Sequence, residues 1–175
     1  MSETSPAVVL VGPPGAGKST VGRLLAHATG RRLVETDEIL AGPDGDVGEL
    51  FLDLGEERFR AAEREAAAGA LAEPGAVVVL GGGAVSDDRT RARLRDLPVV
   101  FLDVSLAAAV PRVGLDAPRP VLVGSPRAAY KSLAAERRPW YLESARWTVD
   151  TSELDPEEVC TRVLSYLDQG STLDS

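Results

Sequence analysis

Short apolar segments alternate with amphipathic segments along most of the 175-residue chain. The apolar segments are bounded by glycine, proline or charged residues, which is typical of strands buried on both faces of a sheet. We expect strands at residues 7–11, 32–36, 76–80, 99–103 and 147–150. Apolar residues recur at helical spacing between them, and we expect helices at 18–30, 55–72, 87–96, 105–113, 130–143 and from 155 onward. This alternation predicts an α/β fold, a three-layer sandwich whose five-stranded parallel sheet is covered by helices on both faces.

Several residues give local signals for where these elements begin and end. Gly30 is a residue that commonly ends a helix, and Thr36 is a candidate cap for a helix after the second strand. Asp155 and Glu158 are spaced as in a capping box at the start of the last helix, with Pro156 in its first turn. Two glycine- and proline-rich stretches, 41–48 and 114–127, predict loops, and the second is long enough to be a lid. We expect the end of the chain, 169–175, to be frayed.

Composition and charge narrow the class of protein. A chain that is 44% hydrophobic has enough apolar residues for one domain, spanning 1–175, with a complete core. A net charge of −8 argues against general binding to nucleic acid or to anionic membranes. The single cysteine, Cys160, excludes an internal disulfide, and with one histidine, His27, no His/Cys metal cluster can form. We find no signal peptide and no apolar run of membrane-spanning length, and we expect a cytoplasmic monomer.

A phosphate-binding pattern follows the first strand. The spacing from Gly12 through Gly17, Lys18 and Ser19 matches G-x-x-x-x-G-K-[ST] at every fixed position, between a strand and a helix. Glycines allow the backbone to wrap round a polyphosphate, the helix N-terminus favours anions, and the serine hydroxyl can ligate Mg²⁺. Only two of the 19 basic residues are lysines, and one of them, Lys18, occupies the motif position that requires a compact ammonium. The alternative, a plain glycine-rich turn, does not explain this combination, so the sequence predicts nucleotide binding.

Acidic residues and glycines follow two other strands. Glu35 and Asp37 come at the end of the second strand, and Gly81–Gly83 directly follow the third. Parallel sheets bind ligands at the carboxyl ends of their strands, so these residues are expected near the phosphate loop. Asp37 can accept a hydrogen bond or a proton from an attacking hydroxyl, and the glycines allow close backbone approach to a substrate.

Arginines beside aromatic residues suggest a binding site for a small carboxylate. Arg60 follows Phe59, and Arg137 precedes Trp140 by one helical turn. A guanidinium group pairs well with a carboxylate, and the rings provide an apolar wall. Arg119, in the predicted lid, is placed to close over the phosphates. The four arginines at alternate positions 89–95 do not share one helical face, and we expect them to be solvent-exposed.

Taken in order, these motifs resemble the shikimate kinase family along nearly the whole chain. The matching segments are Gly12–Thr20, the acidic pair around Thr36, Gly55-Glu56, Phe59-Arg60 with Glu63, Gly81–Val85, Arg119-Pro120, and Arg137 with Pro139 and Tyr141. The resemblance implies a P-loop fold like that of nucleoside-monophosphate kinases. It also implies ATP-dependent phosphorylation of the 3-hydroxyl of shikimate, a reaction of aromatic amino acid biosynthesis.

The resemblance also implies roles for individual residues. The implied catalytic residues are Lys18, Asp37 and Arg119. The implied nucleotide-binding residues are Gly12, Gly15, Ala16, Gly17, Lys18, Ser19, Thr20, Arg112, Arg119 and Pro156. The implied shikimate-binding residues are Asp37, Phe51, Phe59, Arg60, Gly81, Gly82, Gly83 and Arg137, and the implied substrate-binding segment is about 36–65. The implied Mg²⁺ ligands are Ser19 and, through water, Glu35.

The chain departs from the family pattern in three places. Glu35 stands where the family usually has aspartate, the segment 152–154 lacks an arginine that often contacts adenine, and Arg138 beside Arg137 leaves the carboxylate-binding arginine ambiguous by one residue. We favour Arg137 because of its spacing to Pro139.

Other interpretations of the candidate residues remain open at this point. Asp37 can serve as a helix cap, Arg60 can pair with Glu56 or Glu63 at helical spacing, and Phe51 and Phe59 can be core residues. Gly81–Gly83 can be a simple turn, Arg119 a solvated loop charge, and Arg112 a favourable charge at a helix C-terminus. For the activity, the alternatives are a related kinase for gluconate or an aminated shikimate, and a catalytically silent nucleotide-binding module.

Overall fold

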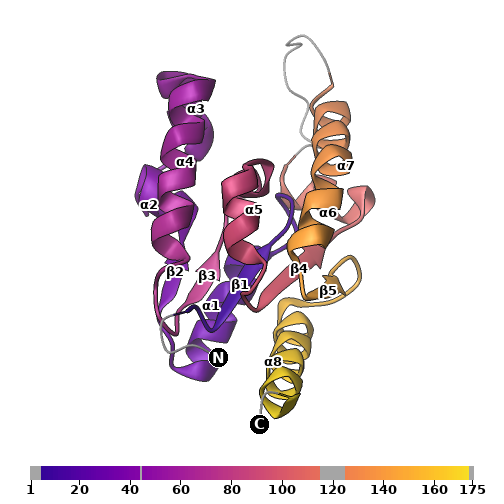
Figure 1. Cartoon of the computed structure of the whole chain (residues 1–175). Coiled ribbons are helices and arrows are strands. Elements are labelled where there is room, and N and C mark those ends of the chain that lie inside the picture. Colours follow the sequence, from indigo (N-terminus) through magenta and orange to yellow (C-terminus); the bar gives the residue numbers. More distant parts are fainter. Residues whose placement is uncertain (1–4, 44, 115–124, 174–175) are drawn as a thin grey trace.

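A computed structural model describes residues 5–43, 45–114 and 125–173 (Figure 1). Five parallel strands form one sheet in the order β2-β3-β1-β4-β5. Their bounds are β1 Val8–Val11, β2 Leu33–Glu35, β3 Val77–Val79, β4 Val99–Asp103 and β5 Trp147–Asp150. All five predicted strands are present, and the predicted α/β fold with a five-stranded parallel sheet is confirmed.

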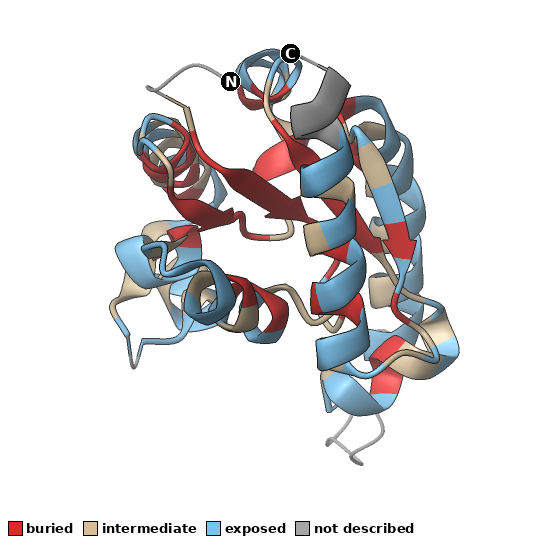
Figure 2. Ribbon diagram, turned by 90° about the horizontal axis from the view of Figure 1, so that it is seen from below, coloured by how far each residue is buried: buried red, intermediate tan, exposed pale blue. Residues whose placement is uncertain are grey.

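The helices cover both faces of the sheet. Their bounds are α1 Lys18–Thr29, α2 Thr36–Ala41, α3 Val47–Leu54, α4 Glu56–Ala70, the 3₁₀ helix η1 Ala84–Ser86, α5 Asp88–Leu94, α6 Leu106–Arg112, α7 Pro126–Ser144 and α8 Pro156–Leu173. Buried side chains of α4, α5 and α7 pack on one face of the sheet, and those of α1 and α8 pack on the other. Successive strand residues point to opposite faces, so each central strand contributes to both cores. Seen from below, the strands form a buried layer between exposed helix surfaces (Figure 2).

Helix caps explain where several helices begin. The Ser105 side chain accepts a hydrogen bond from the Ala108 N–H, as predicted for the start of α6. Asp155 and Glu158 exchange hydrogen bonds of 2.8 and 3.0 Å between side chain and backbone, which is the predicted capping box of α8. Gly30 ends α1 with φ +63°, a conformation that glycine adopts without steric cost.

The structure differs from the predicted elements at four places. Thr36 is the first residue of α2 and does not cap it, because its hydroxyl accepts the Gly81 N–H at 2.8 Å across the sheet edge. The segment 47–54, of which we predicted no helix, forms α3, which begins at an Asp46 cap. Helix α7 begins at Pro126, inside the stretch predicted as a lid, and α8 continues beyond Gln169 to Leu173.

Two helical arms extend past the carboxyl ends of the strands. Helices α3 and α4 form one arm and α6 and α7 the other, while both termini lie toward the opposite end of the molecule (Figure 1). The strand ends, with the loops that follow them, therefore lie between the arms. No described helix is both long enough and apolar enough to cross a membrane.

Candidate active site

The phosphate loop connects β1 to α1 and lines a cavity of about 490 Å³. Gly15 and Gly17 have φ values of +82° and +88°, which L-residues with side chains rarely adopt. A Cβ atom at Gly12 would lie 2.4 Å from the Leu102 carbonyl oxygen of β4, so glycine is required there for packing as well. The loop residues lining this cavity include Gly15, Ala16, Gly17, Lys18, Ser19 and Thr20. The predicted nucleotide-binding residues of this segment, except Gly12, thus line one cavity.

Lys18 is the cation at the bottom of this cavity. Its Nζ donates a 3.2 Å hydrogen bond to the Pro13 carbonyl oxygen. Burial lowers the pKa of Lys18 to about 8, while the negative charges of Asp37 and Glu35 oppose this shift. The ammonium group therefore lies between the phosphate loop and the two carboxylates.

Asp37 lies in the first turn of α2 and faces Lys18 across the cavity. Burial raises the pKa of the Asp37 carboxyl, and the positive charge of Lys18 partly offsets this effect. Because the carboxylate points into the cavity, Asp37 is more than a helix cap, although its position in the first turn also suits a negative charge.

Glu35 is 5% exposed and lines the same cavity. Its Oε2 accepts a 3.3 Å hydrogen bond from the Arg23 guanidinium of α1. A hydrogen bond with Glu35 also raises the pKa of the neighbouring Glu38 carboxyl. The Glu35 side chain, which is one methylene longer than the usual aspartate, is thus held beside the phosphate loop by its ion pair with Arg23. The sequence did not predict this pair.

The Gly81–Gly83 turn packs directly against charged side chains. A Cβ at Gly81 would lie 2.5 Å from Asp37 Oδ1, and one at Gly83 would lie 2.4 Å from Arg60 Nη1. The Gly82 carbonyl oxygen accepts a 2.6 Å hydrogen bond from the Tyr141 hydroxyl. The absence of side chains is therefore needed to let these groups approach the backbone, which a simple turn would not require.

Arg60 and Glu63 form a partly buried ion pair on α4. Arg60 Nη1 donates to Glu63 Oε2 at 2.5 Å, so the predicted helical-spacing pair is with Glu63. Burial raises the pKa of Glu63, and the positive charges of Arg60 and Arg137 oppose this shift. Glu63 thus lies within electrostatic reach of both arginines that the sequence assigned to a carboxylate ligand.

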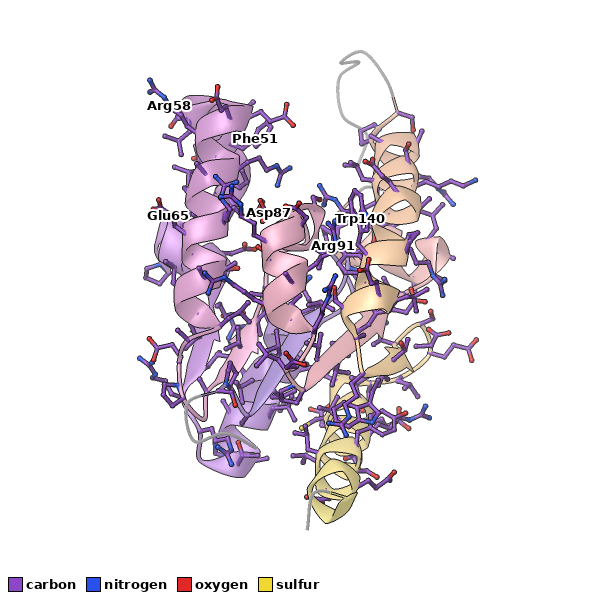
Figure 3. The ribbon with its side chains drawn as sticks, in the orientation of Figure 1. Phe51, Arg58, Glu65, Asp87, Arg91 and Trp140 are labelled. Carbon is purple, nitrogen blue, oxygen red and sulfur yellow. The ribbon has the colours of Figure 1, made fainter. Side chains whose placement is uncertain are left out.

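Two phenylalanines surround the Arg60 guanidinium. The rings of Phe51 and Phe59 make an edge-to-face contact with centroids 5.2 Å apart. The Arg60 Cζ lies 5.9 and 5.4 Å from the two centroids, within the range of a cation–π contact. Phe51 points to the side of its arm that faces α5 and α7, opposite to Arg58 (Figure 3). Phe59 is buried, whereas Phe51 is partly exposed and available to a ligand.

Arg137 and Arg138 have different partners in the structure. Arg138 donates to Asp103 Oδ2 at 2.9 Å, beside the end of β4. Arg137 lies against the Tyr141 hydroxyl, and its charge acts on both Lys18 and Glu63. Of these two arginines, only Arg137 acts electrostatically on Lys18 and Glu63, although it does not itself line the phosphate-loop cavity.

Residues of α6 and of the segment after β5 also line the cavity. Arg112, the last residue of α6, donates to the Gly15 carbonyl oxygen at 3.2 Å and to the Thr151 carbonyl oxygen at 3.0 Å. Leu154 and Pro156 line the cavity beside it. Arg112 thus connects the phosphate loop to the segment after β5. It makes these contacts in addition to placing a favourable charge at the C-terminus of its helix. Arg119 lies outside the described residues.

Arg23, Thr151 and Tyr130 were not singled out in the sequence, and Tyr141 was named only as part of the family resemblance. Arg23 pairs with Glu35, Thr151 contacts the Ala16 carbonyl oxygen at 3.2 Å, and Tyr130 and Tyr141 donate hydrogen bonds to the two glycine-rich loops. All four interactions join residues far apart in the chain, for which local periodicity gives no signal.

Comparison with known proteins identifies the family. The sequence model of the shikimate kinase family matches residues 14–168. The shikimate kinase of Thermobifida fusca is 50% identical over 93% of this chain and 95% of the relative, and that of Saccharopolyspora erythraea is 47% identical over 91% and 93%. Shikimate kinase from Acinetobacter baumannii in complex with shikimate superimposes with a TM-score of 0.84 at 30% identity, covering 96% of both chains. A gluconokinase from Sinorhizobium meliloti shares the fold at 20% identity, with a TM-score of 0.60. The chain, whose phosphate loop, strand-end carboxylates and paired arginines meet at one end of its sheet, therefore belongs to the shikimate kinase family.

Proposed function

We propose that this protein transfers the γ-phosphoryl group of ATP to the 3-hydroxyl of shikimate, giving ADP and shikimate 3-phosphate. The observation that carries this proposal is the arrangement of charged groups around the Gly81–Gly83 turn: Asp37 lies against Gly81, Arg60 lies against Gly83, and the charge of Arg137 acts on both Lys18 and Glu63. Membership of the shikimate kinase family supports the same acceptor.

At the nucleotide end, the phosphate loop and Lys18 bind the phosphates of ATP. Phosphoryl transfer requires the donor, the acceptor and the developing charge to be held in place, with little covalent work by the protein. Lys18 neutralises negative charge on the transferred group, and Arg112 with Pro156 flanks the adenine. Arg119 contributes a further positive charge when the substrates are bound.

At the acceptor end, the two arginines bind the carboxylate of shikimate. Arg60 is held by Glu63 and stacked on the two phenylalanines, so it is oriented before the ligand arrives. Asp37 accepts the hydrogen bond of the 3-hydroxyl and takes up its proton as the oxygen attacks the γ-phosphorus. The raised pKa of Asp37 makes it a better proton acceptor than a solvated aspartate.

Mg²⁺ is part of the proposal, and the donors lining the cavity suit it. Ser19, Glu35 and Asp37 supply hard oxygen atoms beside the phosphate loop. Among the described residues, no group of three or more His, Cys, Asp or Glu side chains forms a metal site made of protein ligands alone. This fits Mg²⁺, which usually keeps several water ligands and binds through substrate phosphates. When bound, the ion shields charge on the phosphates; Ser19 would hold it directly and Glu35 through water. We also propose that the enzyme acts as a cytoplasmic monomer.

An acceptor screen tests the function. ADP release is measured by a coupled assay with shikimate, an aminated shikimate and gluconate, each with Mg²⁺ and ATP. We expect turnover of shikimate. Turnover of gluconate but not shikimate would assign a different acceptor, and ATP binding without turnover of any acceptor would indicate a silent nucleotide-binding module.

A second experiment tests the acceptor-binding arginine. We expect Arg60→Ala to lower kcat/KM for shikimate. The corresponding loss of transition-state stabilisation should be about 1.5–3 kcal/mol, the usual contribution of a hydrogen bond to a charged group. Unchanged shikimate kinetics would contradict its role.

A further inference from the structure

Helix α7 contacts both glycine-rich loops of the site through the same side. Tyr130, Arg137 and Tyr141 are spaced at i, i+7 and i+11, which places them within about 40° of one another around an α-helix at 100° per residue. Tyr130 donates a 2.7 Å hydrogen bond to the Pro14 carbonyl oxygen of the phosphate loop. Tyr141 donates a 2.6 Å hydrogen bond to the Gly82 carbonyl oxygen of the glycine turn. One helix therefore touches the nucleotide end and the acceptor end, with Arg137 between the two contacts.

The two accepting carbonyl groups belong to peptide units whose N–H groups matter for binding. In a planar trans peptide, the C=O and the N–H of the next residue point in opposite directions. None of the described peptide bonds is cis. A hydroxyl that holds the Pro14 carbonyl toward α7 therefore turns the Gly15 N–H away from α7. In the same way, Tyr141 turns the Gly83 N–H away from α7.

Neither N–H group is used by the part of the chain that the structure describes, and Gly83 is buried whereas Gly15 is partly exposed. Among the hydrogen bonds of the described residues, neither Gly15 N nor Gly83 N donates to a protein acceptor. Gly15 lines the nucleotide cavity, and Gly83 packs against the Arg60–Glu63 pair. Backbone N–H groups in these two positions suit a phosphate oxygen and an acceptor oxygen, respectively.

The hydroxyl groups remain protonated donors at neutral pH. Burial raises the pKa of Tyr130 and also that of Tyr141 above the ordinary value of a tyrosine. Tyr141 is further fixed by stacking on Phe101 of β4, with ring centroids 5.0 Å apart. Helix α7 itself packs on η1 and β4, so the two hydroxyls extend from a supported element.

We propose that Tyr130 and Tyr141 are positioning residues that aim the Gly15 N–H at the nucleotide phosphates and the Gly83 N–H at the acceptor. Neither tyrosine acts on the reacting atoms; each acts through the groups that its hydroxyl contacts, which are a peptide unit for both and also the Arg137 guanidinium for Tyr141. Helix α7 thereby fixes the two binding loops relative to each other. The inference rests on the proposed function for the identity of the acceptor, but its nucleotide half stands without it.

The test removes one oxygen atom at a time. The chain has three tyrosines, so Tyr166→Phe, in a side chain stacked on Trp147 of β5, is a matched control for Tyr130→Phe and Tyr141→Phe. Calorimetric titration measures the affinity for ADP in the absence of acceptor and the affinity for shikimate in the absence of nucleotide. Thermal denaturation of each variant is measured in parallel.

We expect each variant to weaken one ligand selectively. Loss of an aligned N–H should raise the Kd of ADP about 3- to 10-fold in Tyr130→Phe, and the Kd of shikimate by a similar factor in Tyr141→Phe. The other ligand should bind unchanged in each case, and Tyr166→Phe should change neither affinity.

Equal loss of both affinities in both variants, or a lower melting temperature with both affinities unchanged, would show a merely structural role and overturn the proposal. If Tyr141→Phe does not fold, the ADP titration of Tyr130→Phe decides. If the wild-type protein does not bind shikimate, the proposed acceptor is wrong, and the ADP titration still decides the nucleotide half.

Discussion

Replacing Gly83 by alanine should damage acceptor binding while leaving the fold intact. Gly83 has φ −89° and ψ −16°, which alanine adopts without strain. The added Cβ would lie 2.4 Å from Arg60 Nη1 and 2.8 Å from Glu63 Oε1. Both obstructing atoms are at the ends of flexible side chains, so they can move without displacing the backbone.

The size of the effect follows from these distances. Ordinary contact begins at 3.4 Å, so the Arg60 guanidinium must move by about 1 Å (3.4 minus 2.4). A displacement of this size removes most of a charge-assisted hydrogen bond, which contributes about 1.5–3 kcal/mol, or about 10- to 150-fold in kcat/KM for shikimate. Stability should be unchanged or slightly higher, because alanine restricts the unfolded chain and can stabilise by about 0.4–1 kcal/mol.

The assay is coupled ADP release with shikimate varied at saturating ATP, followed by ATP varied at saturating shikimate. We expect the loss in the first series and an unchanged KM for ATP in the second. Gly69→Ala is a matched control, since Gly69 is exposed on the same helix as Arg60 and an added Cβ would meet no atom within 4 Å. Wild-type shikimate kinetics in Gly83→Ala would refute the argument that the Arg60–Glu63 pair must contact this glycine to bind the acceptor.

The other predictions concern charge. Lys18→Ala should abolish turnover with the fold preserved. Because the pKa of Lys18 in the empty site is about 8, the affinity of the wild-type protein for ADP should fall above that pH, and binding there should be accompanied by proton uptake. Calorimetry in buffers of different ionisation enthalpy measures the proton uptake, and its absence would contradict the prediction. Arg137→Ala should lower kcat/KM for shikimate by about 1.5–3 kcal/mol, whereas Arg138→Ala, which breaks only the pair with Asp103, should not; equal losses would reject the assignment. Burial raises the pKa of Asp37, so on acidification kcat/KM should begin to decline at a pH above the ordinary pKa of an aspartate. A decline that begins only at that ordinary pKa would argue against Asp37 as the proton acceptor.

Elements with strong local signals were predictable from the sequence. Strands β4 and β5 have the predicted bounds because each is a short apolar or alternating run between breaks. The capping box of α8 was also predictable, since both partners lie within three residues. Helix α3 was missed because it is short and follows a glycine- and proline-rich segment that favours a loop interpretation.

Interactions between segments far apart in the chain determine several side-chain environments that the sequence did not predict. Thr36 has the residue type of a helix cap, but its hydroxyl is taken by the Gly81 N–H. Arg91 was expected to be solvated with its neighbours, yet its side chain is 18% exposed, and its Cζ lies 5.1 Å from the centroid of the Trp140 ring (Figure 3). Periodicity along one helix cannot show which helix packs beside it, so both predictions were wrong.

The candidate site was predicted more fully than its supporting contacts. The residue types at the strand ends and in the phosphate loop were sufficient to assign a nucleotide cavity, because the chemistry depends on short motifs. The sequence favoured Arg137 over Arg138 only from its spacing to Pro139. It could not show that Arg138 pairs with Asp103 or that Arg23 holds Glu35, because these contacts depend on the packing of α7 and α1 against the sheet.

The arrangement of helices on the two faces of the sheet has a consequence for how such enzymes diversify. The nucleotide loop leads into α1, and Pro156 and Val159 of α8 line the same cavity, on one face. The two arginines that we propose bind the acceptor, Arg60 and Arg137, come from α4 and α7, on the other face. Mutations on α4 can reshape the acceptor end without touching the phosphate loop, whereas mutations on α7 act on both ends because Tyr130 donates to the Pro14 carbonyl oxygen. A lineage can thus acquire a new alcohol as its phosphorylation target most readily through α4, while it inherits the nucleotide-binding layer unchanged.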